Sequence, residues 1–253
     1  MKKFTKIALI FASLFAIIGL ILVVASFALG LTWDKVSGMV REGKFNFAIS
    51  TDGLYVGENE GTFITVEEEF RNLDIEFKAG TLEVVYADVD EVEVQQENVP
   101  GFKRYVKDHT LHIEGGTKIG VNTSGGTIIV RIPKDMTFDE VDLEFGAGEA
   151  KFIGLVANSV DIELGAGQAN LTGLAVKELN AEVGAGQLNM ELVGSETDYN
   201  YDAECDIGEI KIGTTSISGL GGSKEVHNPG ANRYMDLECG VGQIQIEFQN
   251  QDI

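Results

Sequence analysis

Residues 141–148 read VDLEFGAG, and nearly the same phrase returns as VDIELGAG at residues 160–167 and as LNAEVGAG at residues 179–186. Each copy begins 19 residues after the one before it. A fixed period near 20 residues is typical of repeat proteins, in which one small unit stacks on the next. The repeat therefore predicts the fold class more firmly than any other feature of the chain.

Each copy predicts two strands joined by a tight turn. In the second copy, apolar residues from Val160 onward alternate with Asp161 and Glu163, which is the period of a half-buried strand. Residues 165–167 (GAG) follow, and we expect the glycines to provide φ > 0 at a sharp bend. Residues 168–172 alternate again and predict the second strand.

The predicted inward positions agree between the copies and form three apolar columns. These columns are Phe145, Leu164 and Val183; Ala150, Ala169 and Leu188; and Phe152, Leu171 and Met190. We therefore expect an all-β parallel β-solenoid of roughly 20-residue repeats, in which the columns become continuous rows inside the molecule. An antiparallel β-sandwich stays open as the alternative, because GAG turns also suit hairpins.

Divergent copies extend the array on both sides. They lie at residues 73–84, 201–212 and 235–246. Between the first of these and residue 141, strand-like runs at residues 91–94, 111–113 and 127–132 predict degenerate repeats or caps. Residues 213–234 are rich in Gly and Ser, so we expect an inserted loop on one side of the stack.

The N-terminus predicts a membrane anchor. Residues 7–31 contain no charged residue over 25 positions, which is longer than the roughly 20 residues that span a bilayer. Lys2, Lys3 and Lys6 precede this run, so we expect a signal-anchor whose residues 1–6 form a cytoplasmic tail. A cleaved signal peptide is the competing interpretation, with a small-residue site at residues 26–28.

Under either interpretation the β-rich part is exported. We expect a single-pass protein of the cell membrane whose repeat domain is extracytoplasmic. Residues 32–66 mix charge, Gly and isolated aromatics and predict a membrane-proximal linker. Residues 67–250 are then long enough for one sizeable repeat domain.

The chain is strongly acidic, with 40 Asp and Glu against 19 Lys and Arg, a formal net charge of −21. This charge argues against a nucleic-acid partner, because phosphates need a basic patch. It also argues against adsorption to anionic lipid headgroups. We therefore expect contact with the membrane through residues 7–31, and an envelope polymer or a membrane protein as a further partner.

Part of the acidic charge falls in register between the copies. One template position is held by Glu144, Glu163, Glu182, Glu204 and Glu238, with Glu76 upstream, and a second by Asp74, Asp142, Asp161, Asp202 and Asp236, with Asn180 in the third full copy. On a stack these positions form outward ladders of like charge. The ladder is either a solvated face that keeps the domain soluble or a face that binds cations such as Ca²⁺. The calcium-solenoid motif is not met, because Gln168 follows GAG.

Cys205 and Cys239 share one inward template position. In adjacent repeats they could approach disulfide distance, and the alternative is two buried free thiols.

No pattern in the sequence indicates catalysis, a metal site or a cofactor. His109, His112 and His227 lack accompanying metal-ligand motifs. GAG lacks the third glycine of a dinucleotide fingerprint and recurs as a turn, and neither a nucleophile elbow nor a Walker pattern is present. We predict no catalytic, metal-binding or cofactor-binding residue.

Residues 127–134 (TIIVRIPK), leading into the first GAG copy, resemble the DUF4097 family. Its members are bacterial envelope proteins with β-strand repeats, labelled putative adhesins, and some have one N-terminal transmembrane helix. The resemblance covers roughly residues 67–250 and implies the repeat fold and an envelope location. It carries over no catalytic residue. Some members look like accessories of envelope-stress systems.

Three functions follow from the sequence and the resemblance. The first is a non-enzymatic, membrane-anchored surface module that adheres to an envelope polymer or a protein. The second is an accessory or regulatory subunit of an envelope-stress or sensing system. The third, which the sequence disfavours, is a polysaccharide-acting enzyme, because paired carboxylates occur throughout the repeats and single out no site.

Overall fold

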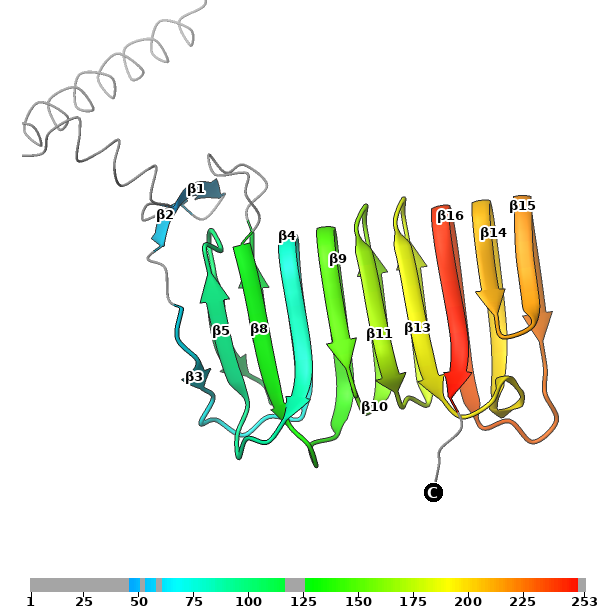
Figure 1. Cartoon of the computed structure of the whole chain (residues 1–253), viewed down its shortest axis with the longest axis horizontal. Coiled ribbons are helices and arrows are strands. Elements are labelled where there is room, and N and C mark those ends of the chain that lie inside the picture. The colour runs from blue at the N-terminus through cyan, green and yellow to red at the C-terminus, as the bar shows by residue number, and fades with distance from the viewer. Residues whose placement is uncertain (1–45, 51–52, 58–60, 117–125, 250–253) are drawn as a thin grey trace, which may run out of the picture. The chain divides into compact units, whose positions relative to one another are not determined.

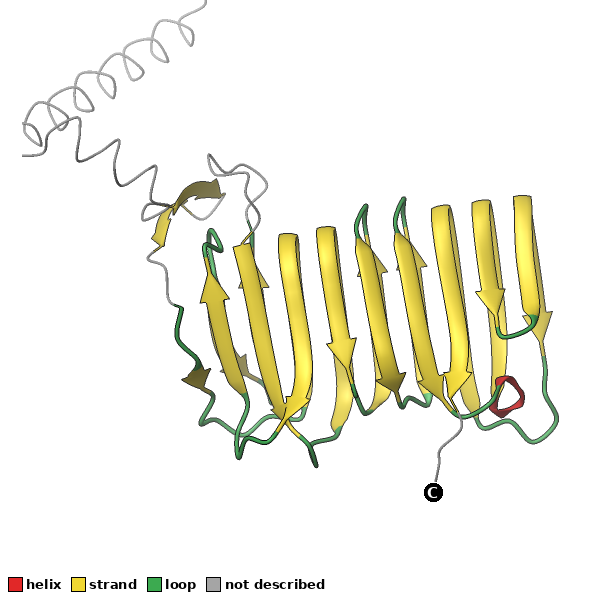
Figure 2. Cartoon of the chain, in the orientation of Figure 1, coloured by secondary structure: helices red, strands yellow, loops and turns green. Residues whose placement is uncertain are grey.

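The computed structural model describes residues 46–50, 53–57, 61–116 and 126–249, which are built almost entirely of β-strands (Figures 1 and 2). The strands are β1 (Asn46–Ser50), β2 (Gly53–Gly57), β3 (Ile64–Thr65), β4 (Asn72–Ala87), β5 (Glu93–Glu97), β6 (Lys103–Lys107), β7 (Thr110–Gly115), β8 (Gly126–Pro133), β9 (Phe138–Ile153), β10 (Ala157–Leu164), β11 (Gln168–Leu174), β12 (Glu178–Val183), β13 (Gln187–Val193), β14 (Tyr199–Ile212), β15 (Thr215–Val226) and β16 (Arg233–Gln249). β1 and β2 pair with each other in a separate antiparallel sheet.

The repeats stack in parallel, as the sequence predicts. The first halves of the repeats form one layer, in which β9, β10 and β12 are parallel neighbours. The second halves form another layer, in which β9, β11 and β13 are parallel neighbours. β4, β9, β14 and β16 bend at the glycine corner and run through both layers. The repeats are therefore not the antiparallel hairpins of the alternative interpretation.

The three apolar columns predicted from the sequence are confirmed. Phe145, Leu164 and Val183 are buried and lie in register. The columns that begin at Ala150 and Phe152 are also buried and in register in the second layer. Because each column joins side chains that are 19 residues apart, the core forms only when the repeats stack.

The order of strands departs from the order of the chain at the C-terminal end. β16 lies between the third copy, β12 and β13, and the preceding strand β14. Residues 213–234 were expected to be a loop, and this prediction is wrong. Within them β15 pairs antiparallel with β14 along its whole length and ends the stack. Ile217 is buried between exposed Ser216 and Ser218, which is the alternation of a half-buried strand. Despite its Gly and Ser content, the segment therefore pairs as a strand.

The same kind of insertion occurs at the other end. β4 lies between β9 and the later strands β7 and β8. The runs predicted to be degenerate repeats or caps are strands β5, β7 and β8, and β5 and β6 add antiparallel partners at this end. At both ends, antiparallel strands therefore follow the parallel stack.

The corner between the two layers is a continuous backbone ladder. The amide of Ala166 donates to the carbonyl of Gly146 at 2.7 Å, and the amide of Ala185 donates to the carbonyl of Gly165 at 2.7 Å. A Cβ on Gly165 would lie 2.7 Å from the Gly146 oxygen, and one on Gly167 would lie 2.9 Å from the Gly148 oxygen.

These distances correct the reason that we expected glycine here. Neither Gly165 nor Gly167 has positive φ, whereas Gly148 of the first copy does, at 115°. In the second copy glycine is required because the backbone of the preceding repeat lies too close for a side chain.

The predicted transmembrane anchor at residues 7–31 lies outside the described residues. Among those that the structure describes, no helix is both long and apolar enough to cross a membrane.

The two cysteines occupy neighbouring strands. Cys205 of β14 lies in register with Cys239 of β16, and both are buried free thiols. Burial, together with the adjacent Cys205 thiol, raises the pKa of Cys239 to about 11.

Gly165→Val should destabilise the domain by about 1–3 kcal/mol, because the new side chain overpacks against the backbone of Gly146 in the preceding repeat. Ala166→Val is the matched control, since Ala166 is exposed between the two glycine columns. Thermal unfolding measures both variants. Equal melting temperatures for the two would contradict the close approach at the corner.

A mild oxidant should form an intramolecular Cys205–Cys239 disulfide in the folded protein, because in-register neighbours on parallel strands lie about 4.8 Å apart. The reaction should accelerate as the pH approaches the raised pKa of Cys239, because the thiolate is the nucleophile. Loss of two hydrogens by mass spectrometry reports the bond. A disulfide that forms only in denaturant would show that β14 and β16 are not neighbours.

Candidate binding face

The five glutamates predicted as a ladder lie in register on neighbouring strands of the first layer. Their order along the stack is Glu144, Glu163, Glu182, Glu238 and Glu204. All five side chains are exposed, because they alternate with the buried residues of the same strands. The carboxylates therefore repeat at the strand spacing of about 4.8 Å.

A second acidic column runs beside the first, two residues earlier on each strand. Its members in stacking order are Asp74, Asp142, Asp161, Asn180, Asp236 and Asp202. We call the outward side of the first layer, with these two columns, the acidic face. A hollow of about 450 Å³ lies on it, lined mainly by carboxylates from Glu140 to Glu238.

Lys78 and His112 contact the acidic face at its N-terminal end. Lys78 pairs with Glu76 and with Glu144, the latter at 2.6 Å. His112 Nδ1 lies 2.7 Å from Asp74 Oδ2 on the neighbouring strand. Burial lowers the pKa of Lys78, but its hydrogen bonds to Glu144 and Glu76 outweigh this and raise the pKa above its ordinary value.

The rest of the acidic face has no such compensation. Among the described residues, Glu163, Glu182, Glu238 and Glu204 make no ion pair. One amide relieves the repulsion locally, because Asn180 Nδ2 donates to Asp161 Oδ1 at 2.6 Å. The acidic face can therefore bind positive charge along the central and C-terminal part of the stack.

Asp142 shows the effect of the neighbouring charges. Burial raises the pKa of its carboxyl, and the carboxylates of Asp74, Asp161, Glu163 and Glu140 raise it further. The sequence predicted this column, but the contacts that Lys78 and His112 make with it depend on register and could not be read from composition.

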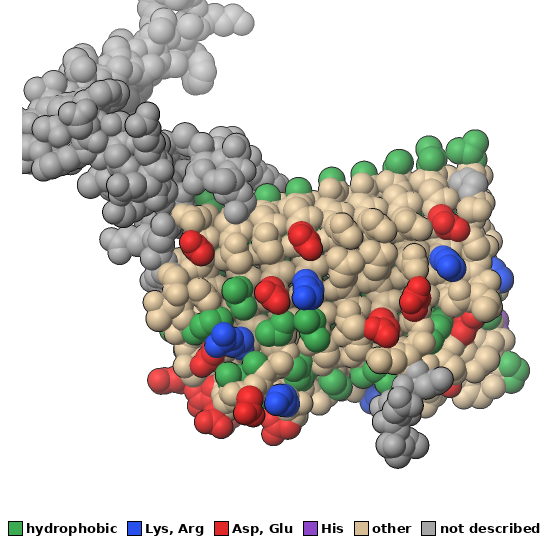
Figure 3. All heavy atoms as spheres, viewed as in Figure 1, with side chains coloured by type: hydrophobic (Ala, Val, Ile, Leu, Met, Phe, Trp, Pro, Cys, Tyr) green, Lys and Arg blue, Asp and Glu red, His purple; other side chains and the backbone are tan. Residues whose placement is uncertain are grey.

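The opposite face differs in chemistry. The outward side of the second layer carries Gln168, Gln187 and Gln243 in register, beside a column of Asn170, Asn189 and Gln245. Asn189 Nδ2 donates to Asn170 Oδ1 at 2.9 Å. Figure 3 is viewed from this side and shows scattered charges on a mostly uncharged surface. Glu149 and Glu209 continue the first of these columns, and Lys151 and Lys211 continue the second, so acids and bases are mixed on this side. The acidic columns lie on the first layer.

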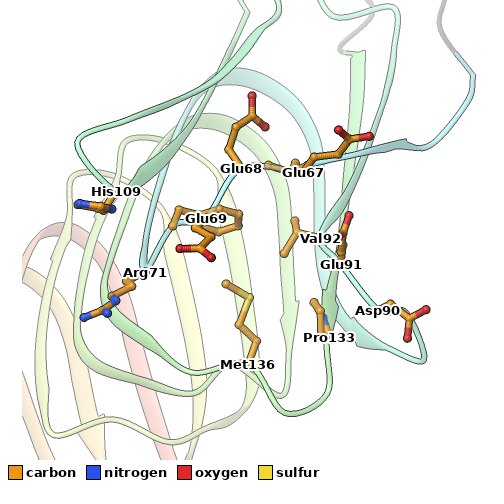
Figure 4. A pocket seen from close by; sticks show the side chains of 12 residues that line it. Glu67, Glu68, Glu69, Arg71, Asp90, Glu91, Val92, His109, Pro133 and Met136 are labelled. Atoms are coloured by element: carbon orange, nitrogen blue, oxygen red, sulfur yellow. The ribbon is translucent and has the colours of Figure 1, made fainter.

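A second hollow of about 440 Å³ lies at the N-terminal end, beside β4, β5 and β8. Its lining combines the apolar side chains of Val92 and Met136 with acidic residues. Figure 4 shows the carboxylates of Glu67, Glu68 and Asp90 directed away from Val92 and Met136. These polar groups do not converge on a common point, as the groups of an active site would.

The three histidines contribute to turns and surface pairs. His109 has φ 63°, and its carbonyl accepts the amides of Arg71 and Asn72 at 2.9 and 3.1 Å. His112 pairs with Asp74, and exposed His227 pairs with Glu225 at 3.0 Å. In the part of the chain that the structure describes, no group of three His, Cys, Asp or Glu could hold a metal ion.

The chain matches a known protein family. The family profile described as Toastrack DUF4097 matches residues 63–252. A search among curated proteins finds no match.

Solved structures of similar fold cover most of the chain. A putative cell adhesion protein from Clostridium sporogenes ATCC 15579 is 17% identical with a TM-score of 0.53, over 74% of this chain and 98% of its own. A putative adhesin from Bacteroides fragilis NCTC 9343 is 15% identical with a TM-score of 0.36, over 73% of this chain and 97% of its own. At this identity the first likeness supports the fold alone.

Asp142→Asn should stabilise the domain at pH 7 by roughly 0.2–1 kcal/mol, because it removes one carboxylate from a repulsive ladder. The folded-state pKa of Asp142 is raised, so its ionisation costs stability. That cost appears as the pH rises above the ordinary pKa and is complete above the raised pKa. The gain should therefore vanish below the ordinary pKa of 3.8 and shrink in high salt.

Thermal unfolding at pH 7 and at acidic pH measures the difference. Asp135→Asn is the control, because Asp135 is exposed and lies off the acidic face. An Asp142 variant that is less stable than the parent at pH 7 would contradict the repulsion.

Proposed function

The chain belongs to the Toastrack DUF4097 family, and on that premise we propose that it is a non-enzymatic adhesion module of the bacterial cell envelope. Its acidic face binds positively charged groups of an envelope polymer or of a partner protein. Residues 7–31 anchor it in the membrane, with residues 1–6 in the cytoplasm and the repeats outside.

The observation that carries this proposal is the uncompensated ladder of carboxylates. Glu163, Glu182 and Glu238 follow one another in register with no ion pair among the described residues. A row of equal charges at a fixed spacing suits a polymer that carries positive charges at regular intervals. Once one charge is bound, the next ones bind at high effective concentration, so the overall binding is stronger than that of a single contact. The hollow of about 450 Å³ along this row gives such a ligand a path.

The name of the Clostridium sporogenes protein supports a role in adhesion. The shape of the acidic face also supports binding rather than catalysis. Its carboxylates stand on the exposed side of a sheet, whereas a glycosidase places two carboxyl groups on either side of a bound sugar.

A binding experiment tests the acidic face directly. The full chain in detergent is titrated with poly-L-lysine of defined length and, separately, with a purified cell-wall fraction. The test variant combines Glu163→Gln, Glu182→Gln and Glu238→Gln. We expect about tenfold weaker binding, since each exposed charge contact contributes roughly 0–1 kcal/mol. The interaction should also weaken with salt.

The matched control combines Glu67→Gln, Glu68→Gln and Glu91→Gln, which changes the net charge equally at the N-terminal hollow. This control should bind like the parent. Equal loss in both variants would show that net charge alone attracts the polymer, and absence of binding by the parent would overturn the proposal.

A further inference from the structure

A row of exposed apolar side chains runs along the glycine corner of the stack. In stacking order its members are Ala79, Ala147, Ala166, Ala185, Val241, Ile207 and Leu220. We call this row the corner ridge. Figure 3 shows it as a line of hydrophobic side chains along the upper edge.

The ridge follows from the backbone of the corner. Its residues stand at the apex where each repeat passes from one layer to the other. Glycine flanks them on both sides except at Ala79 and Ile207, which follow Lys78 and Asp206. Because they lie at the apex, the ridge side chains point away from the core and take no part in it. Alanine at the apex is therefore explained by the backbone alone. Nothing in the packing of the stack requires the larger Val241, Ile207 and Leu220 at the same position.

The ridge side chains are larger at the end of the stack formed by β16, β14 and β15. Alanine occupies the first four positions, and the last three are Val241, Ile207 and Leu220, which are 56%, 53% and 87% exposed. They lie on adjacent strands β16, β14 and β15. Three neighbouring aliphatic side chains this exposed are unfavourable in water and mark an interaction surface.

We propose that Val241, Ile207 and Leu220 insert into the surface of a lipid bilayer, so that the C-terminal end of the stack rests on the membrane. This inference rests on the anchor in the proposed function, which holds the domain near the bilayer at high effective concentration. The ridge is convex, and a convex aliphatic edge fits a soft planar surface without a complementary groove.

The charge distribution is consistent with this orientation. Val241, Ile207 and Leu220 carry no charge, and neither do the glycines that flank Val241 and Leu220. Asp206, which stands where other copies have glycine beside the ridge, is exposed and lines a hollow with Glu182, Glu204 and Glu238 of the acidic face. A domain that meets the bilayer through its corner keeps the carboxylates of the acidic face in water, because they stand on the side of the first layer. A contact made through three uncharged side chains also lessens the repulsion that a net charge of −21 would meet at anionic headgroups.

A second copy of the chain is disfavoured as the occupant. Each copy carries a net charge of −21, so two copies repel each other. The edge strand β15 is also protected. Lys224 lies opposite buried Ala203 and therefore starts from the core-facing side of the sheet, and its Nζ donates to Thr215 Oγ1 at 3.4 Å. Inward-pointing lysines on edge strands oppose pairing with another edge.

The test uses the full chain reconstituted into phosphatidylcholine vesicles, with an environment-sensitive fluorophore on Leu220→Cys. Cys205 and Cys239 are buried and leave the label selective. The matched control carries the label on Ala79→Cys, which is exposed at the opposite end of the same ridge. We expect blue-shifted emission at position 220 that brominated lipids quench, and neither effect at position 79.

The combination of Val241→Ser and Ile207→Ser should reduce the quenching at position 220 without changing the melting temperature, because both side chains are exposed. Two results would overturn the inference. One is a label at position 220 that stays in water. The other is a blue shift that brominated lipids do not quench, which would indicate a protein occupant.

Vesicle flotation separates this inference from the proposed function. A chain that floats with the vesicles but shows no quenching at position 220 retains the anchor and contradicts only the ridge contact. A chain that does not float contradicts the anchor and the ridge contact together. Binding of poly-L-lysine by the acidic face is independent of either result.

Discussion

In-register parallel hydrogen bonding between repeats is the constraint on which the rest of the structure depends. It continues from the first layer through the corner, where the amide of Gly184 donates to the carbonyl of Leu164 at 2.8 Å, and into the second layer. Because successive side chains of a strand point to opposite faces of the sheet, this single register decides which residues enter the core and which face water. Glycine at the corner keeps the backbones close enough for the ladder to continue.

The same register places chemically similar side chains beside each other on neighbouring strands. This stabilises the apolar columns inside the domain and destabilises the carboxylate columns on its surface. Inside, each buried Val, Leu or Ile contributes about 1.5–3 kcal/mol. Outside, each pair of neighbouring carboxylates costs roughly 0.2–1 kcal/mol and is screened by salt. The apolar columns are therefore strong enough to hold the acidic columns together. The fold tolerates a repulsive surface that would not assemble alone, and that surface then attracts positive charge.

The sequence predicts which residues of the repeats lie in register. It does not predict the order in which the strands follow one another in the stack. The column of Phe145, Leu164 and Val183 and the glutamate ladder could be aligned because their spacing is constant. The positions of β4 and β16 in the stack could not be predicted from the sequence. The divergent copies share the same pattern of buried and exposed residues, so any of them would fit beside any other. β15 was missed because its Gly and Ser content is typical of loops, although Ile217 fills a core position at the end of the stack. The ridge was missed because its variation from Ala to Leu has meaning only in stacking order.

The most direct test of this account is disulfide trapping between exposed corner positions. Ala185 lies beside Val241, and Ile207 lies one strand further. In the pair Ala185→Cys and Val241→Cys the two positions are about 4.8 Å apart, so a disulfide should form. In the pair Ala185→Cys and Ile207→Cys they are roughly twice as far apart, beyond disulfide reach, so none should form. The reverse result would mean that the repeats stack in chain order, and it would contradict the insertion of β16 and the order of both the acidic face and the corner ridge.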